Sequence, residues 1–282
     1  MATAIPFTKM QGAGNDYIYI NGFTCHIDDP GELAKKMSDR HFGIGSDGLV
    51  LILPSDSADI AMRMFNSDGS EAEMCGNATR CVGKFAYDHD LAKKPVIHLQ
   101  TRAGIKVIEL HFRDGKVWGA TVDMGEPRLA PQDIPVALSG STVIAQPISI
   151  DGEEYAFTGV SMGNPHAVIF MTHIDKLDLA SLGPQFEYHP FFPQRVNTEF
   201  VEILSRDRIR MRVWERGAGE TLACGTGACA ALVASCLNDL TGPEADVELK
   251  GGILHIKWDK ASNHVFMTGP AVTVFDGEYF LE

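Results

Sequence analysis

Two of the six cysteines in this 282-residue chain lie in sequence contexts that suit acid–base chemistry. The cysteines stand at positions 25, 75, 81, 224, 229 and 236. None belongs to a Cys-x-x-Cys pair and no spacing fits a zinc finger or ribbon, so we expect no metal site. Disulfides are not expected in a reducing compartment. Four cysteines are then small buried hydrophobes, whereas Cys75 and Cys224 begin the motifs Cys-Gly-Asn and Cys-Gly-Thr.

The two motifs hold equivalent places in an internal repeat. Cys75 and Cys224 are 149 residues apart, and the same offset relates Asn15, in M-Q-G-A-G-N, to Asn164, in S-M-G-N. Because two separate motifs share one offset, we interpret the chain as two copies of a unit of about 140 residues. A length of 282 residues is compatible with two small domains.

Each motif is placed where a strand-like segment ends and a helix begins. A cysteine there experiences the positive end of the helix dipole, which can lower a thiol pKa from ~8.5 into the range ~3.5–7.5. The amides of the residues that follow can hold a carboxylate. These residues are Gly76 and Asn77 in the first copy, and Gly225 and Thr226 in the second.

Two thiols on opposite sides of one small molecule would invert a carbon centre. One thiolate removes a proton from one face, one thiol returns a proton to the other, and the amides stabilise the negative charge that develops. No motif demands a pyridoxal cofactor, and we expect none. One such motif alone would favour a tight turn around an inert thiol. Two at equal repeat positions favour the catalytic interpretation.

The segments around the cysteines predict an α+β fold. Residues 77–89 and 226–238 are expected helices, and the second is apolar on nearly every face, so other structure must wrap it. Residues 105–110 and 208–214 alternate as half-buried strands do, and Asp114-Gly115 is a hairpin turn. We therefore expect each unit to be a mixed or antiparallel sheet around one buried helix.

Residues 43–48 match the dinucleotide-binding pattern G-x-G-x-x-G. That function needs a strand before the pattern and a helix after it. Here residues 32–40 look helical and residues 49–53 look like a strand, so we reject a dinucleotide site.

Composition excludes several partners. With 24 basic and 37 acidic residues the net charge is −13, which argues against nucleic-acid binding. The apolar stretches are shorter than the ~20 residues that span a bilayer, so we expect no membrane association. The N-terminus shows no apolar signal region, which favours the cytoplasm.

The chain resembles the diaminopimelate epimerase family over essentially its whole length. The matching segments are K-M-Q-G-A-G-N-D-Y at 9–17, R-H-F-G-I-G-S-D-G at 40–48, F-N-S-D-G-S-E-A-E-M-C-G-N at 65–77, M-G-N-P-H at 162–166, R-V-N-T-E-F at 195–200 and W-E-R-G-A-G-E-T-L-A-C-G-T-G-A at 214–228. The resemblance implies cofactor-independent interconversion of LL- and meso-diaminopimelate, in lysine and peptidoglycan precursor synthesis. It also implies a homodimer and two pseudo-symmetric domains, each a barrel-like sheet around a central helix. We place them at residues 1–120, completed by 270–282, and at 121–269.

The resemblance assigns roles residue by residue. Cys75 and Cys224 correspond to the acid/base pair. The substrate-binding set is Asn15, Asn66, Gly76, Asn77, Asn164, Asn197, Glu215, Arg216, Gly225 and Thr226. Arg216 suits a two-pronged contact with the distal carboxylate of diaminopimelate, and Glu215 suits its distal ammonium. Position 48 is Gly where some members carry Gln, so no side-chain contact is expected there.

Two alternatives remain. A related two-thiol racemase or dehydratase could act on proline or hydroxyproline, but those substrates give Glu215 and Arg216 no joint role. A non-catalytic amino-acid-binding protein would need neither Cys75 nor Cys224.

The assignment of Arg216 makes a testable prediction. Arg216→Ala should lower diaminopimelate turnover about tenfold or more, because a hydrogen bond between charged groups contributes about 1.5–3 kcal/mol. Circular dichroism should show an intact fold. Unimpaired turnover would contradict the distal-carboxylate assignment.

Overall fold

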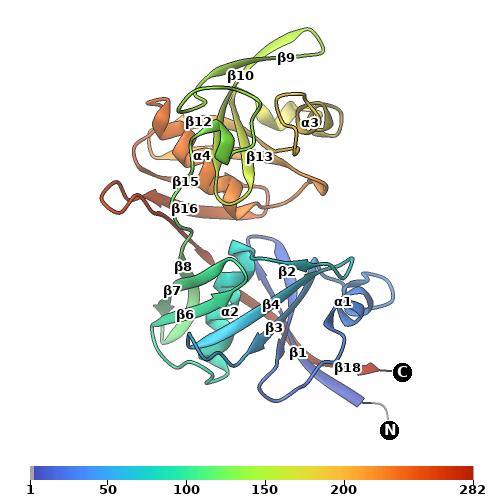
Figure 1. Ribbon diagram of the computed structural model, residues 1–282. Coiled ribbons are helices and arrows are strands. Elements are labelled where there is room, and N and C mark those ends of the chain that lie inside the picture. The colour runs from blue at the N-terminus through green and yellow to red at the C-terminus, as the bar shows by residue number, and fades with distance from the viewer. Residues whose placement is uncertain (1–2, 282) are drawn as a thin grey trace. The chain divides into compact units, whose positions relative to one another are not determined.

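The computed structural model describes residues 3–281, and contacts between residues divide the chain into two units. The first runs up to Asp123 and also includes the chain from Thr268 onward; the second is Met124–Met267. In Figure 1 the first unit is coloured blue to green with a red final strand, and the second is coloured green to orange.

The first unit is built on a mixed sheet. Its strands are β1 (Thr3–Gly12), β2 (Asn15–Asn21), β3 (Gly48–Leu53), β4 (Ile60–Asn66), the short β5 (Glu71–Ala72), β6 (Val96–Thr101), β7 (Gly104–Arg113), β8 (Lys116–Asp123) and β18 (Val272–Leu281). The pairing runs β18–β1–β2–β3–β4–β6–β7–β8, with β2–β3 and β4–β6 parallel and the other pairs antiparallel. Helix α1 (Pro30–Ser38) packs on β3 and β4.

Helix α2 (Gly76–Asp88) is enclosed by the strands of its own unit. It contacts β1, β2, β3, β7 and β8. Because that environment leaves no water for polar groups, the fully buried Arg80 must be paired. Its guanidinium donates to Oδ1 of Asn77 (2.8 Å) and to the backbone oxygen of Pro270 (3.1 Å), and so ties the helix to the returning end of the chain.

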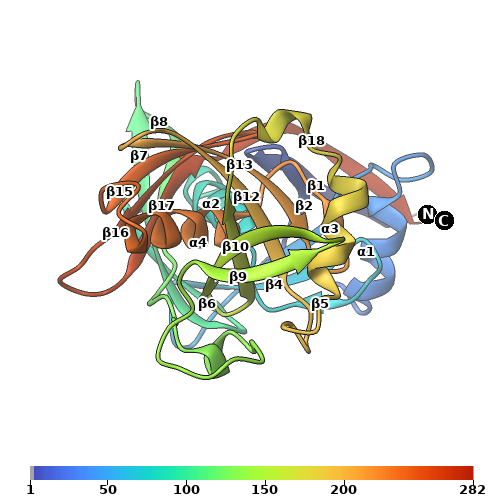
Figure 2. The same cartoon turned by 90° about the horizontal axis from the view of Figure 1, so that it is seen from above.

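The second unit repeats this organisation. Its elements are β9 (Gln146–Ile150), β10 (Glu153–Ser161), β11 (Pro165–Phe170), α3 (Leu179–Glu187), β12 (Asn197–Ser205), β13 (Arg208–Glu215), β14 (Gly219–Glu220), α4 (Gly225–Leu237), β15 (Glu244–Leu249) and β16 (Gly252–Trp258), with 3-10 turns at Pro131–Asp133 and Ile174–Lys176. Strand β17 (Val265–Pro270) begins in this unit and ends in the first. Here β11–β12 and β13–β15 are the parallel pairs. Helix α4 contacts β10, β11, β12, β13, β15 and β16 (Figure 2).

Each unit has a further hydrophobic core that contains no residue of its central helix. In the second unit, Phe186 of α3 packs edge-on against Phe200 of β12, with ring centroids 5.5 Å apart. In the first, Met37 of α1 lies in one cluster with Ile18 and Leu49. Fully burying one such side chain contributes roughly 1.5–3 kcal/mol. These cores hold the strands whose ends carry the polar motifs.

The strand registers follow the offset seen in the sequence. Tyr17 pairs with Gly48 in β2–β3, and the residues 149 positions later, His166 and Asn197, pair in β11–β12. Likewise Leu49 pairs with Phe65, and Thr198 with Trp214. The repeat is therefore present in the hydrogen-bonded pairing of the strands as well as in the motifs.

The predicted elements are confirmed. The two helices begin and end one residue before the predicted limits, because the motif glycines Gly76 and Gly225 already belong to the first turn. Asp114 and Gly115 both adopt positive φ, 50° and 73°, as a two-residue hairpin requires. The G-x-G-x-x-G segment lies between helix α1 and strand β3, the order opposite to a dinucleotide fold.

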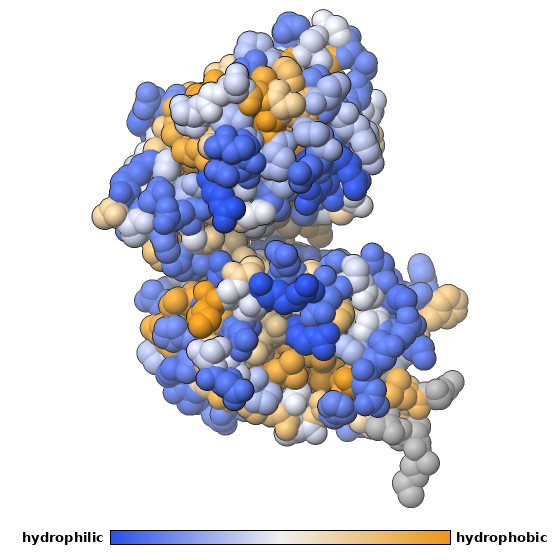
Figure 3. Space-filling model, in the orientation of Figure 1, coloured by the Kyte–Doolittle hydropathy of each residue, from blue (hydrophilic) through white to orange (hydrophobic). Residues whose placement is uncertain are grey.

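The surface is mixed in character. The face in Figure 3 carries polar side chains with scattered apolar patches. None of the helices within residues 3–281 has the length and apolar character needed to cross a bilayer.

Gly48 is required by close packing at the start of β3. A Cβ there would lie 2.1 Å from the backbone oxygen of Phe65 and 2.9 Å from the ring of Tyr17. Gly48→Ala should therefore lower the free energy of unfolding by about 1–3 kcal/mol, the usual cost of overpacking. Urea denaturation measures it, with Gly242→Ala as the control, because a Cβ at Gly242 meets nothing within 4 Å. Equal losses in both variants would contradict the packing argument.

Candidate active site

Cys75 is the N-cap residue of α2 and has extended backbone angles. Its half-buried thiol donates to Oδ1 of Asn15, 3.3 Å away at the start of β2. The backbone and hydroxyl of Thr79 both donate to the Cys75 carbonyl, each at 2.9 Å, and so hold the residue on the first turn. The structure thus brings Asn15, one of the predicted substrate-binding residues, to the thiol of Cys75.

A network of charged side chains supports Asn15. Its Nδ2 donates to Oδ2 of Asp47 (2.6 Å), and Arg40 bridges Asp47 and Asp16, at 2.9 Å from each. Lys9 pairs with Asp16 at 2.6 Å. Burial tends to raise the pKa of Asp16, but its hydrogen bonds to Arg40 and Lys9 hold the pKa below its usual value. Burial and the neighbouring Asp16 raise the pKa of Asp47.

Cys224 is the N-cap residue of α4 and is only 5% exposed. Its Sγ lies 3.5 Å from Oγ1 of Thr226. That hydroxyl accepts from Nδ2 of Asn164 at 3.2 Å. Cys224, Thr226 and Asn164, all predicted site residues, therefore form one hydrogen-bonded group.

A buried histidine and carboxylate extend this group. Nε2 of His166 lies 3.0 Å from Oδ1 of Asn164, and Nδ1 lies 2.7 Å from Oε1 of Glu199. His166 and Glu199 are both 0% exposed. A Cβ on Gly227 would lie 2.7 Å from that Glu199 oxygen and 3.3 Å from the Cys224 sulfur. The absence of a side chain at Gly227 therefore lets the first turn of α4 approach both groups.

The pKa of Cys224 differs from the one expected from the sequence. Burial, followed by the charges of Glu215 and Glu199, raises its pKa well above the ordinary thiol value. The hydroxyl of Thr226 and the N–H of Gly227 act in the opposite direction. The prediction that the helix N-terminus lowers the thiol pKa is therefore wrong for Cys224, because loss of hydration outweighs the amide donors in this enclosed site.

Glu215 and Arg216 end β13 and begin the next turn. Glu215 is half-buried and accepts from the hydroxyl of Thr221; burial raises its pKa, and hydrogen bonds from Thr221 and Cys224 oppose the rise. The Arg216 side chain is exposed and donates to the backbone oxygen of Gln194 (3.0 Å). The two residues are neighbours in the chain, and their side chains have different partners.

Asn197 and Glu187 hold the turn that carries Arg216. Oδ1 of Asn197 accepts the Arg216 N–H (2.9 Å), and its Nδ2 donates to the Pro165 carbonyl (2.8 Å). The buried Glu187 accepts from the N–H of Gly217 (3.0 Å) and from Nε1 of Trp214 (2.7 Å). Asn197, predicted to bind substrate, therefore fixes the backbone here with both ends of its amide.

The remaining predicted residues lie at strand or helix ends. Gly76 and Gly225 are the first residues of α2 and α4. Asn77 is buried and accepts from Arg80. Asn66 ends β4, and its Nδ2 donates to the hydroxyl of Ser70 at 3.0 Å.

Residues important to the arrangement were missed by sequence reasoning. Asp47, Glu199 and Glu187 orient the predicted residues, and none was proposed. Asp47 and Glu199 lie inside the motifs at 40–48 and 195–200, which was the available signal. Glu187 lies in no motif, and only its burial beside Trp214 identifies it.

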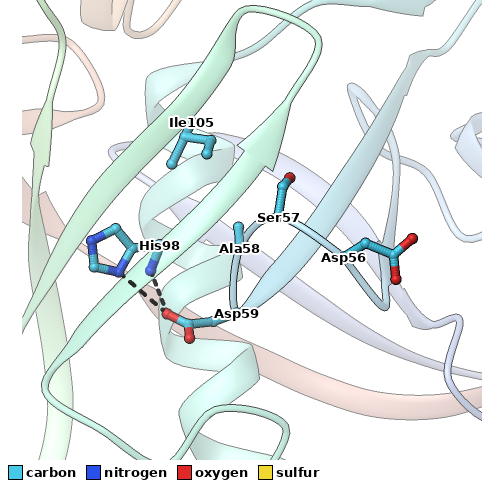
Figure 4. Close-up of a pocket in the computed structure, with 6 residues that line it drawn as sticks. All are labelled: Asp56, Ser57, Ala58, Asp59, His98 and Ile105. Carbon is cyan, nitrogen blue, oxygen red and sulfur yellow. Dashed lines mark hydrogen bonds and ion pairs between the residues drawn. The ribbon is translucent and has the colours of Figure 1, made fainter.

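A pocket elsewhere in the first unit has different chemistry. It is lined by Asp56, Ser57, Ala58, Asp59, His98 and Ile105 (Figure 4). Asp59 accepts the backbone N–H of His98 (2.8 Å) and also pairs with Lys94 (2.7 Å). No predicted site residue lines it. Within the described part of the chain, no cluster of three or more His, Cys, Asp or Glu is arranged to hold a metal.

The pKa of Cys224 gives a prediction. Glu215→Gln removes a negative charge that disfavours the thiolate, so the pKa of Cys224 should fall and its alkylation by iodoacetamide below pH 9 should become severalfold faster. Mass spectrometry of the Cys224 peptide measures the rate. Glu220→Gln is the control, since that carboxylate pairs with Arg212 and Lys250. Unchanged or slower alkylation in Glu215→Gln would contradict the electrostatic account.

Among solved structures the likeness concerns the fold. A hydroxyproline epimerase from Agrobacterium vitis, with bound trans-4-hydroxy-L-proline, superposes with a TM-score of 0.69 at 16% identity, covering 99% of this chain and 92% of that one. A Bacillus anthracis phenazine biosynthesis protein of the PhzF family gives 0.68 at 16% identity, covering 99% and 100%.

Sequence comparisons are more specific. The family model described as diaminopimelate epimerase matches residues 7–130 and 158–274. The diaminopimelate epimerase of Desulfovibrio desulfuricans is 65% identical, with 100% of both chains covered. That of Acetivibrio thermocellus is 60% identical, covering 96% of this chain and 97% of its own. The α+β fold with a cysteine at the N-cap of each enclosed helix, and these full-length matches, together show that the chain belongs to the diaminopimelate epimerase family of isomerases.

Proposed function

We propose that the chain interconverts LL- and meso-diaminopimelate by two-base proton transfer between Cys75 and Cys224, without a cofactor, in lysine and peptidoglycan precursor synthesis. Membership of the family supports the substrate and the reaction class. The observation that carries the mechanism is that both cysteines are N-cap residues of enclosed helices, at equivalent repeat positions.

In the proposed reaction the two thiols act on opposite faces of one α-carbon. The thiolate of one cysteine takes the α-proton and becomes a thiol, leaving the electron pair on the α-carbon and its carboxylate. The thiol of the other cysteine delivers its proton to the opposite face and becomes a thiolate. The reverse reaction exchanges the two roles, so each thiol serves as acid and as base.

The helix N-termini supply the electrostatic part of the mechanism. The free N–H groups of Gly76 and Asn77, and those of Gly225 and Thr226, suit the carboxylate as it gains negative charge. The raised pKa of Cys224 makes its thiolate a strong base once formed, which helps it to remove a weakly acidic α-proton.

The distal end of diaminopimelate distinguishes it from the alternative substrates proline and hydroxyproline. Diaminopimelate carries a second zwitterion, for which Arg216 suits the carboxylate and Glu215 the ammonium. Asn66, Asn164 and Asn197 complete the proposed polar set. Proline and hydroxyproline lack this second zwitterion, so the presence of both Glu215 and Arg216 favours diaminopimelate.

The proposal includes a cytoplasmic homodimer. The final strand β18 exposes large apolar side chains, among them Val274 (54% exposed) and Phe280 (58%), which suit packing against a second copy. A monomer mass in sedimentation equilibrium at micromolar concentration would contradict the dimer.

Exchange of the α-proton with solvent deuterium tests the function. Wild-type protein should incorporate deuterium into diaminopimelate and not into proline or hydroxyproline, with no added cofactor. Cys75→Ala and Cys224→Ala should each lose at least about a hundredfold in rate, the lower end of the usual contribution of general acid–base catalysis. Cys25→Ala, a matched control on another thiol, should exchange at the wild-type rate. Wild-type exchange in either catalytic variant would overturn the two-thiol mechanism, and exchange of proline alone would overturn the substrate.

A further inference from the structure

The side-chain amide of Asn15 has a fixed orientation. Oδ2 of Asp47 receives both the Asp16 N–H (3.1 Å) and Nδ2 of Asn15 (2.6 Å). A carboxylate can only accept hydrogen bonds, whereas a carboxamide has one donor end and one acceptor end. Asn15 must therefore turn its NH₂ toward Asp47, which leaves its carbonyl oxygen facing the sulfur of Cys75 at 3.3 Å.

Asp47 is itself held in place. Its other oxygen accepts from Arg40 (2.9 Å), its backbone N–H donates to the Asp16 carbonyl (2.8 Å), and its carbonyl accepts from Ser67 (3.1 Å). The guanidinium of Arg40 forms an ion pair with this carboxylate. Asp47 thus presents a carboxylate to Asn15 in one position.

The second unit has no carboxylate at the position equivalent to Asp47. The residue 149 positions after Asp47 is Val196, a buried apolar side chain. Asn164, equivalent to Asn15, turns its Nδ2 to Thr226 and its oxygen to His166 instead. The carboxylate is therefore not a requirement of the repeated fold, and it bears on one cysteine of the pair.

Other titratable groups interact with Cys75. Burial raises the pKa of Tyr19, on β2, well above its usual value, and raises that of Cys81, on α2, to about 11, so these two neighbours are uncharged near neutral pH. The Asn15–Asp47 contact connects Cys75 to the charges of Arg40, Asp16 and Lys9. On the helix side, the guanidinium of Arg80 donates to the Gly76 carbonyl at 3.4 Å, and this charge is common to all the variants compared below.

We propose that Asp47 is a positioning residue that acts through Asn15 to hold Cys75 as a thiol in the free enzyme. A carbonyl oxygen directed at sulfur accepts from S–H and repels a thiolate, so the protonated form is favoured. The inference rests on the proposed function, in which Cys75 exchanges protons with the substrate. Cys75 is then poised to act as the acid of the pair.

The test is the pH profile of Cys75 alkylation by iodoacetamide in the free protein, followed by mass spectrometry of the Cys75 peptide. In Asp47→Asn the neutral amide no longer dictates which end of Asn15 faces sulfur. The midpoint of the profile should move to lower pH by about one unit, a typical effect of one hydrogen bond on a titrating group. Asn15→Ala, which removes the acceptor, should move it in the same direction.

Two controls separate orientation from charge. Asp16→Asn removes the same charge one residue from Asn15, but its side chain does not contact the Asn15 amide, so the midpoint should stay near that of wild type. In the Asn15→Ala background, Asp47→Asn should add little, because interacting residues are non-additive when one acts through the other.

Two results would overturn the proposal. One is an equal shift in Asp47→Asn and Asp16→Asn; the other is a full Asp47→Asn shift that persists in Asn15→Ala. If Asp47→Asn does not fold, as judged by circular dichroism, an unmoved midpoint in Asn15→Ala also overturns it. Alkylation does not depend on turnover, so failure of the proposed function, visible as deuterium exchange in Cys75→Ala, remains distinguishable.

Discussion

The enclosure of one helix in each unit is the constraint on which the rest of the structure depends. A helix surrounded by sheet must satisfy the polar groups of its buried turns within the protein, since little water reaches them there. The N-terminal turn of each helix is where backbone N–H groups stay free, and a cysteine precedes each of these turns. The backbone donors of this turn are the hardest to pair within the protein. The same turn is therefore the part of the helix best suited to bind an anionic ligand.

Enclosure also determines the direction in which the thiol pKa shifts. The helix dipole contributes about 0.3–1 kcal/mol toward the charged form, up to ~2 kcal/mol in favourable sites. Full burial can shift a pKa by as much as 3–5 units, at about 1.4 kcal/mol each, against the charged form. At Cys224 burial is nearly complete and two carboxylates lie nearby, so desolvation prevails. A buried thiol at a helix N-terminus is therefore not automatically a low-pKa thiol.

The two units share a backbone plan and differ in the polar groups placed on it. The strand registers repeat with an offset of 149 residues, and the asparagines Asn15 and Asn164 repeat with them. Their partners do not repeat: Asp47 fixes Asn15, while His166 and Glu199 extend from Asn164. Duplication of the fold thus provides two similar thiol sites, and the different partners of the two asparagines make them unequal.

Residue types and spacing were enough to predict the repeat, both helices, the hairpin at Asp114-Gly115 and the rejection of a dinucleotide site, because these depend on local pattern and on turn chemistry. The direction of the Cys224 pKa shift could not be obtained this way, because desolvation depends on strands far away in the sequence. The same holds for Asp47 and Glu199: each lies within a recognised motif, but its partner is about 30 residues away along the chain. The sequence by itself determined the repeat and the residue types at both helix N-termini, and from these it predicted which groups carry the chemistry. Only the tertiary structure decided how each is hydrated, oriented and charged, since those properties belong to neighbours that the fold brings together.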